Sequence, residues 1–244
     1  MAEEAAREPL ELHATDWRIL PGLLGLPVEA DAPALSCVPW ATAGLAVAIV
    51  LAFLASLHAG LQETIRNWGF VPDAMFRHLG ATFVTSFFLH GGWFHLGSNL
   101  WFLLVFGDNT EDALGRWRYL AMIAAGHLAG TVAELLVPGS GAIPRVGASA
   151  GISAVVAFYA LKFPHARLGM LFRYFYSLRW VTFSARTGFF LWVALQVVGA
   201  VFEFQGLGGV AHLAHLGGAA AGLAWWWRDE KRHSAGTFDP DAST

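Results

Sequence analysis

Three stretches of the sequence place polar side chains inside otherwise apolar segments. His95 and Asn99 lie four residues apart, Ser149 stands between two glycines, and His215 lies in a segment rich in glycine and alanine. A serine nucleophile requires an adjacent base such as imidazole. Further hydrogen-bond donors are needed where negative charge develops on a substrate oxygen. The pattern therefore indicates acyl-transfer chemistry carried out within a hydrophobic protein.

The serine segment permits two interpretations. Gly147 and Gly151 allow close backbone approach beside Ser149 and leave N–H groups free at a helix start, as an oxyanion requires. Small residues at this spacing also occur where helices pack tightly, which is the structural alternative. The nucleophile elbow of α/β-hydrolases has the same spelling, but it needs a strand and a sheet that this sequence does not predict.

The histidine segment predicts a helix face that can approach a neighbour closely. At 100° per residue, His215 and Gly218 share one face, and Ser149 and Ser153 share a face of another predicted helix. Apposing these faces would bring Ser149 within hydrogen-bond reach of a histidine. His212, one turn before His215, is predicted to be a supporting polar residue. The acidic residues lie away from the predicted position of Ser149, so no carboxylate is expected to orient the histidine. We therefore expect a Ser-His dyad rather than a triad.

The pair formed by His95 and Asn99 lies on one helical face, because the two residues are four apart. The structural alternative is that such a pair joins two helices by hydrogen bonds. The presence of His90 nearby favours a functional role for the pair. His90 itself and His127 are predicted to be structural.

The elements that must position these residues are membrane helices. Hydrophobic residues make up 56% of the 244 residues and charged residues 14%, and the mean hydropathy is +0.50. An ordinary soluble domain cannot bury that much apolar surface. A window of about 20 residues, the length that crosses the hydrocarbon core, identifies six segments. They are 38–57, 89–106, 119–137, 146–163, 187–202 and 207–227.

These segments predict an all-α membrane protein built as a six-helix bundle. The fourth segment is expected to be short and submerged, because Ser149 lies about three residues into its span and His215 about eight, a difference of several ångströms at 1.5 Å per residue. If the chain before Ser149 dips into the protein, the two side chains come level. The polar residues in the second, fourth and sixth segments should face the interior of the bundle.

Charge placement predicts the orientation. With the N-terminus inside, twelve of the fifteen Lys and Arg residues fall on the cytoplasmic side, so both termini are expected to be cytoplasmic. The predicted organisation is a cytoplasmic segment at 1–37, a membrane domain at 38–227 and a cytoplasmic tail at 228–244. High alanine and glycine content and the lack of an organelle presequence favour a multi-pass protein of a bacterial inner membrane.

Four motifs in order resemble the rhomboid family of intramembrane serine proteases, over roughly residues 69–227. The segment from His90 to Asn99 resembles the second-span motif of that family, and Gly147-Ala-Ser149 its nucleophile motif. The segment around His215-Leu-Gly-Gly218 resembles its general-base motif, and 107–118 the loop between spans two and three.

The resemblance implies cleavage of peptide bonds within or beside transmembrane segments of single-span or polytopic membrane-protein substrates. Ser149 would be the nucleophile and His215 the base, and the oxyanion would be held by the Ser149 N–H with His95 and Asn99. Gly147, His212 and Gly218 would support the site. The lipid bilayer is the expected surroundings, with no nucleic-acid partner. No cofactor or metal is expected, because the sequence has no His-Glu-x-x-His pattern.

Two positions depart from the family pattern. Ala150 follows the nucleophile where the family usually has glycine, so a methyl group is added near the expected oxyanion site. Ser153 stands where some members place an aromatic ring on the catalytic imidazole. The alternatives are an inactive rhomboid-like protein that binds client helices and a transporter or channel that uses buried histidine and glutamate residues as a proton path.

Overall fold

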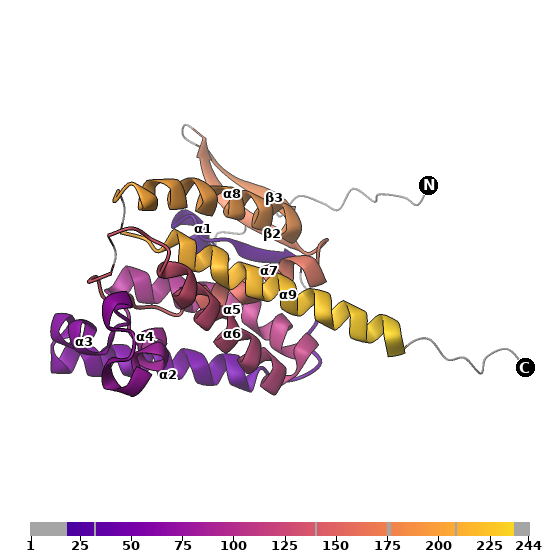
Figure 1. The fold of residues 1–244 in the computed structure, drawn as a ribbon. Helices are drawn as coiled ribbons and strands as arrows, with labels where there is room; N and C mark the ends of the chain where they lie inside the picture. Colours follow the sequence, from indigo (N-terminus) through magenta and orange to yellow (C-terminus); the bar gives the residue numbers. More distant parts are fainter. Residues whose placement is uncertain (1–18, 32, 140, 175–176, 208, 237–244) are drawn as a thin grey trace, which may run out of the picture.

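The computed structural model describes residues 19–31, 33–139, 141–174, 177–207 and 209–236 as a bundle of helices with a small sheet at one side (Figure 1). In chain order the elements are α1 (Ile19–Leu23), β1 (Val28–Asp31), α2 (Trp40–Ala59), α3 (Leu61–Trp68), η1 (Pro72–Ala74), η2 (Arg77–Gly80), α4 (Thr82–Phe88), α5 (Trp93–Leu114), α6 (Arg116–Glu134), α7 (Ser149–Lys162), β2 (Arg167–Tyr174), β3 (Ser177–Ser184), α8 (Ala185–Phe204) and α9 (His212–Gly236).

Each of the six predicted spans coincides with a helix, namely α2, α5, α6, α7, α8 and α9. Among the described helices, α2 and α8 are long and apolar enough to cross a membrane, with mean hydropathies of 2.2 and 1.7. The apolar helix α7 is shorter than that test requires. The number of six crossings therefore stays a prediction, while the helical bundle itself is confirmed.

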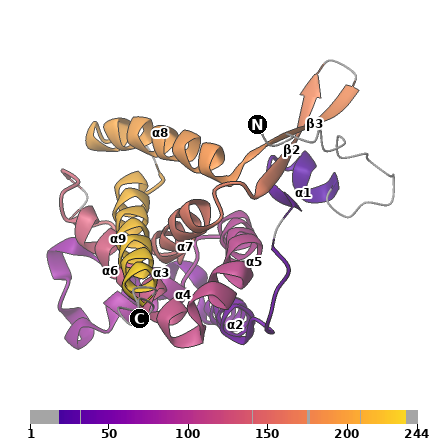
Figure 2. The ribbon, with the colours of Figure 1, turned by 90° about the vertical axis from the view of Figure 1, so that its right-hand side faces the viewer.

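Helix α7 lies at the centre of the bundle. Figure 2 shows it between α5, α6, α8 and α9, and all of these helices contact it. Every residue from Ala150 to Ala160 is buried, because the small side chains of this segment allow neighbouring helices to approach from several directions. Its 14 residues extend about 21 Å at 1.5 Å per residue, less than the roughly 30 Å of a hydrocarbon core. A short fourth helix is therefore observed, and its submergence in a bilayer stays a prediction.

Glycine residues set the contact between α7 and α9. A Cβ atom on Gly218 would lie 1.9 Å from the carbonyl oxygen of Ala150, and one on Gly222 would lie 2.2 Å from that of Ala154. Both distances are far below van der Waals contact, so these two positions of α9 admit only glycine at the present spacing. This is the close helix contact that the sequence predicts, and it fixes the height of α9 against the start of α7.

We expect Gly218→Ala to lower the free energy of unfolding by about 1–3 kcal/mol, because the added methyl group must push the α7 backbone away. Unfolding in detergent micelles, followed by tryptophan fluorescence, measures this difference. Gly44→Ala is the matched control, since Gly44 also lies in a helix and a Cβ there meets no atom within 4 Å. Equal stabilities of the two variants would contradict the packing account.

A three-stranded antiparallel sheet corrects the prediction of an all-α protein. Strands β2 and β3 form a hairpin between α7 and α8 that pairs from Arg167↔Ser184 to Tyr174↔Ser177, and β1 adds to the other side of β2. Figure 2 shows the hairpin projecting from the bundle with α1 beside it. A window of 20 residues averages over strands of eight residues, so the hydropathy scan could not detect them. The aromatic and β-branched residues of 180–183 are typical of strands.

The sheet ties the N-terminal segment to the bundle. The Tyr159 hydroxyl of α7 donates a hydrogen bond to the Glu29 carboxylate on β1, and the indole Nε1 of Trp101 on α5 donates to the Pro27 carbonyl at 2.8 Å. Val28 between them is 1% exposed. Part of the segment predicted as a cytoplasmic extension is therefore packed against helices that carry the candidate site.

Candidate active site

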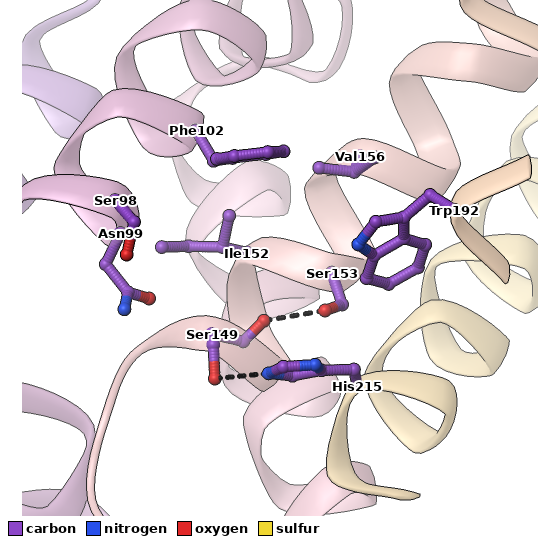
Figure 3. A pocket seen from close by; sticks show the side chains of 9 residues that line it. All are labelled: Ser98, Asn99, Phe102, Ser149, Ile152, Ser153, Val156, Trp192 and His215. Atoms are coloured by element: carbon purple, nitrogen blue, oxygen red, sulfur yellow. Dashed lines mark hydrogen bonds between the residues drawn. The ribbon is translucent and has the colours of Figure 1, made fainter. Parts of the chain in front are cut away.

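Ser149 and His215 meet where two helices begin. Ser149 is the first residue of α7, and His215 lies in the first turn of α9. Ser149 Oγ and Nε2 of His215 form a hydrogen bond of 2.9 Å, as Figure 3 shows. This is the geometry of a nucleophile and its general base. The structure thus brings together the two residues that the sequence predicts as the dyad.

The difference in depth that the sequence predicts between Ser149 and His215 is absent, because α9 begins later than predicted. The sixth predicted segment starts at residue 207, but α9 starts at His212. Gly206, with a φ of +73°, follows the end of α8, and residues 209–211, directly before α9, are not helical. His215 therefore lies in the first turn of its helix, level with the start of α7. The predicted difference arose from the helix boundary.

The ring of His95 is held with a donor facing the nucleophile loop. Its Nδ1 accepts a hydrogen bond from the Gly91 N–H at 3.2 Å, so in the neutral ring the proton lies on Nε2. A Cβ atom on Gly147 would come within 2.7 Å of that Nε2 and within 3.8 Å of Ser149 Oγ. His95 Nε2 therefore lies beside Gly147, in the loop that leads to Ser149.

Gly147 is required for two reasons. Its φ of +125° lies in a region that side chains rarely adopt, and a Cβ would collide with His95. Its N–H donates to the Ser86 carbonyl at 2.8 Å, which anchors the loop to α4. The loop can therefore pass close under the imidazole and begin α7 at Ser149.

Asn99 lies one turn after His95 and lines the same cavity as Ser149. Its amide Nδ2 donates to the His95 carbonyl at 2.8 Å, and its Oδ1 has no hydrogen-bond partner within the described part of the chain. The amide NH₂ group has a second N–H, which can donate to an oxyanion while the first stays bonded to this carbonyl. Asn99 is therefore a second side-chain candidate for that role.

The cavity beside the dyad has a volume of about 140 Å³ and is partly open, and Figure 3 shows the side chains that line it. Apolar side chains from α5, α7 and α8 share its wall with polar groups from α5, α7 and α9. A volume of this kind, apolar with a few convergent polar groups, is typical of a substrate site. The lining residues are Ser98, Asn99, Phe102, Ser149, Ile152, Ser153, Val156, Trp192 and His215.

The methyl group of Ala150 does not line this cavity. A Cβ on Gly130 of α6 would lie 2.5 Å from the Ala150 Cβ, so the methyl group packs into the space that this glycine leaves. The departure from the usual glycine after the nucleophile is thus accommodated by a glycine on the neighbouring helix.

Two residues of α8 complete the surroundings of His215, and the sequence analysis did not identify either. The Trp192 ring lies with its centroid 6.2 Å from that of His215, at an angle of 32°. Gln196 Oε1 lies 2.9 Å from Nδ1 of His215 and 2.8 Å from Nδ1 of His212. A polar residue inside an apolar segment was the signal that could have pointed to Gln196. Ser153, at the position of the expected aromatic ring, donates to the Ser149 carbonyl at 2.7 Å.

An ion-paired cluster supports the loop before Ser149. Arg145 Nε lies 2.9 Å from Glu134 on α6, and its Nη1 lies 3.9 Å from Glu203 on α8. Glu203 also accepts a hydrogen bond from the Leu213 N–H at the start of α9, at 3.0 Å. These acidic residues therefore join the loop to three helices, a connection that the sequence analysis did not predict.

His90 and His127 have structural surroundings. His90 Nδ1 lies 3.2 Å from the Phe88 carbonyl, and the ring packs 4.9 Å from that of His95. His127 Nε2 lies 2.9 Å from the Phe83 carbonyl oxygen. Within the described ranges, no group of three or more His, Cys, Asp or Glu side chains could hold a metal ion.

Comparison with known proteins adds a family assignment. A family model described as "Rhomboid domain" matches residues 77–232. The chain is 28% identical over 185 residues to the human "Presenilin-associated rhomboid-like protein, mitochondrial", covering 75% of this chain and 46% of that protein. It is 27% identical over 179 residues to "Rhomboid protein 1, mitochondrial" of Saccharomyces cerevisiae, covering 69% and 49%.

A third relative is "Rhomboid-like protein 11, chloroplastic" of Arabidopsis thaliana, 30% identical over 162 residues that cover 65% of this chain and 55% of that protein. The chain thus spans about half the length of the curated relatives it matches. The names of these relatives refer to mitochondria and chloroplasts, so the prediction of a bacterial inner membrane finds no support.

Proposed function

The chain belongs to the rhomboid family of membrane proteins, and we propose that it is a serine endopeptidase that cleaves membrane-protein substrates within or beside their transmembrane segments. The observation that carries this proposal is the 2.9 Å hydrogen bond from Ser149 to His215 beside an open cavity. An inactive relative has no need to keep both groups in this geometry.

The proposed reaction uses the dyad twice. Ser149 Oγ attacks the carbonyl carbon of the scissile peptide bond while His215 Nε2 takes its proton. His215 then returns that proton to the leaving amine, and the bond to nitrogen breaks, which leaves an acyl-enzyme on Ser149. In the second half, water loses a proton to His215 and attacks the ester, and the carboxylic acid leaves as Ser149 regains its proton.

The charge that develops on the substrate oxygen would be held by three donors. The Ser149 N–H lies at the N-terminus of α7, where backbone N–H groups lack helical acceptors and the helix dipole favours negative charge. The Nε2–H of His95 faces the same space. Asn99 would add the second N–H of its amide, while the first stays bonded to the His95 carbonyl.

The deciding experiment reconstitutes the purified protein in liposomes with a panel of single-span substrates. We expect cleavage products whose new termini, located by mass spectrometry, fall within or next to the transmembrane segment. Ser149→Ala is the matched control. Absence of both cleavage and labelling by a fluorophosphonate would favour the alternative, a catalytically inactive protein that binds client transmembrane helices.

The transporter alternative is less well supported by the surroundings of the buried residues. A proton path needs groups that can exchange protons along a chain, but Glu134 and Glu203 flank Arg145 in an ion-paired cluster. His127 contacts a backbone carbonyl. These groups therefore have structural roles in the proposed protease.

We further propose six crossings with both termini in the cytoplasm, and hence cytoplasmic segments at 1–37 and 228–244 around a membrane domain at 38–227. A reporter fused to the C-terminus should be active only in the cytoplasm, because an even number of crossings returns the chain to its starting side. Protease protection in sealed vesicles provides the independent measurement. A C-terminal reporter on the opposite side would contradict the six-span topology.

A further inference from the structure

One face of helix α8 lies against the start of α9 and carries Trp192, Gln196 and Gly199. Trp192 and Gln196 are four residues apart and therefore share a face, and Gly199 follows on the same side. A Cβ atom on Gly199 would lie 2.4 Å from the His212 ring, so this glycine lets the ring lie against α8. The first turn of α9, with both of its histidines, thus packs on a surface that α8 supplies.

The amide of Gln196 joins the two histidines. Its Oε1 atom lies 2.9 Å from Nδ1 of His215 and 2.8 Å from Nδ1 of His212, and the residue is 8% exposed. An amide oxygen only accepts hydrogen bonds, so both Nδ1 atoms must carry protons. Two donors converge on the two lone pairs of one oxygen. His212 thereby holds the amide with its oxygen, and not its NH₂ group, toward His215.

This arrangement determines the tautomer of the catalytic ring. With its proton on Nδ1, a neutral His215 has a lone pair on Nε2, which faces the Ser149 hydroxyl at 2.9 Å. The opposite tautomer would direct a lone pair at the Gln196 oxygen and an N–H at Ser149. A ring in that state cannot take the serine proton.

We propose that Gln196 is a positioning residue that holds His215 in the tautomer and orientation needed by the base, with His212 fixing the amide and Trp192 limiting rotation of the ring. This inference rests on the proposed protease function, in which His215 is the base. It assigns to a neutral amide on α8 the role that a carboxylate fills in a triad. A neutral group orients the ring without the cost of burying a further charge.

The test replaces Gln196 with leucine, which keeps a similar volume but cannot accept a hydrogen bond. We expect kcat to fall roughly 10- to 100-fold, because the loss of the hydrogen bond that orients the His215 ring lowers the rate by about one to two factors of ten. KM should stay within about twofold, because Gln196 does not line the cavity. Gln196→Glu should recover most of the lost kcat, because its carboxylate oxygens accept the same protons. Val197→Ala, on the neighbouring and exposed position, is the control for changes in α8.

Nitrogen-15 NMR of histidine-labelled protein, with His215 assigned by its substitution, reads the tautomer directly and needs no substrate. We expect the Nδ1-protonated form in the wild type and a mixture of tautomers in Gln196→Leu. An unchanged tautomer and unchanged kcat in Gln196→Leu would overturn the inference. If the tautomer shifts as expected while the wild type cleaves no substrate and binds no fluorophosphonate, the positioning role stands and the protease function fails.

Discussion

Replacing Ser149 with alanine is expected to lower kcat by roughly four to six orders of magnitude, because the nucleophile of a dyad has no substitute. His215→Ala should have a loss of similar size, since the 2.9 Å hydrogen bond makes the two residues one catalytic unit. Residues that act as a unit are not additive, so the double variant should be no slower than either single one. Initial rates on a fluorescent transmembrane substrate in liposomes measure these differences.

Ser153→Ala is the control for the dyad. Ser153 is a second hydroxyl in the same cavity, but it donates to the Ser149 carbonyl and does not contact His215 by a hydrogen bond. Its loss should change kcat by no more than about tenfold, the value of one hydrogen bond. Cleavage that survives in Ser149→Ala, or a larger loss in Ser153→Ala, would show that the nucleophile has been misassigned.

The second large effect is expected at the oxyanion site, where the two side-chain donors should differ. Removal of a preorganised donor typically costs about 10²–10³ in kcat, and we expect this for His95→Ala. The reason is that the Gly91 N–H already fixes the His95 ring with its Nε2–H beside Ser149. Asn99→Ala should cost about tenfold, the value of one hydrogen bond, because one N–H of its amide is bonded to the His95 carbonyl and only the second can donate to the oxyanion.

Comparison of kcat with KM for both variants checks this order. A donor to the oxyanion acts mainly in the transition state, so kcat should fall while KM changes little. Ser98→Ala is a suitable control, since its hydroxyl lines the cavity but donates to the His95 backbone carbonyl. A greater loss in Asn99→Ala than in His95→Ala would contradict the view that the ring is the preorganised donor.

The sequence predicted the parts of the fold that depend on composition over long windows. Apolar runs of about 20 residues identified all six main helices, and the spacing of Ser149, His215 and Gly218 predicted the close contact between α7 and α9. The rest depends on local backbone geometry. The start of α9 at His212 depends on the preceding turn, and the β2–β3 hairpin depends on strand pairing. Both are short segments, and a window of about 20 residues averages their hydropathy with that of their neighbours.

The neighbours of the His215 ring were missed for a different reason. Gln196 and Trp192 reach His215 from α8, and the contact depends on how that helix rotates and packs. Periodicity within one segment shows which residues share a face, but not which partner that face meets. The same limit explains why Arg145 and its two glutamates, each near a different helix end, were not recognised as one cluster.

The central claim is that Ser149 is a nucleophile activated by His215, and the site of covalent labelling tests it most directly. After reaction with a fluorophosphonate in liposomes, peptide mass spectrometry should place a single adduct on Ser149, and His215→Ala should abolish it. An adduct on Ser153 or elsewhere, or equal labelling of Ser149 without His215, would contradict the claim.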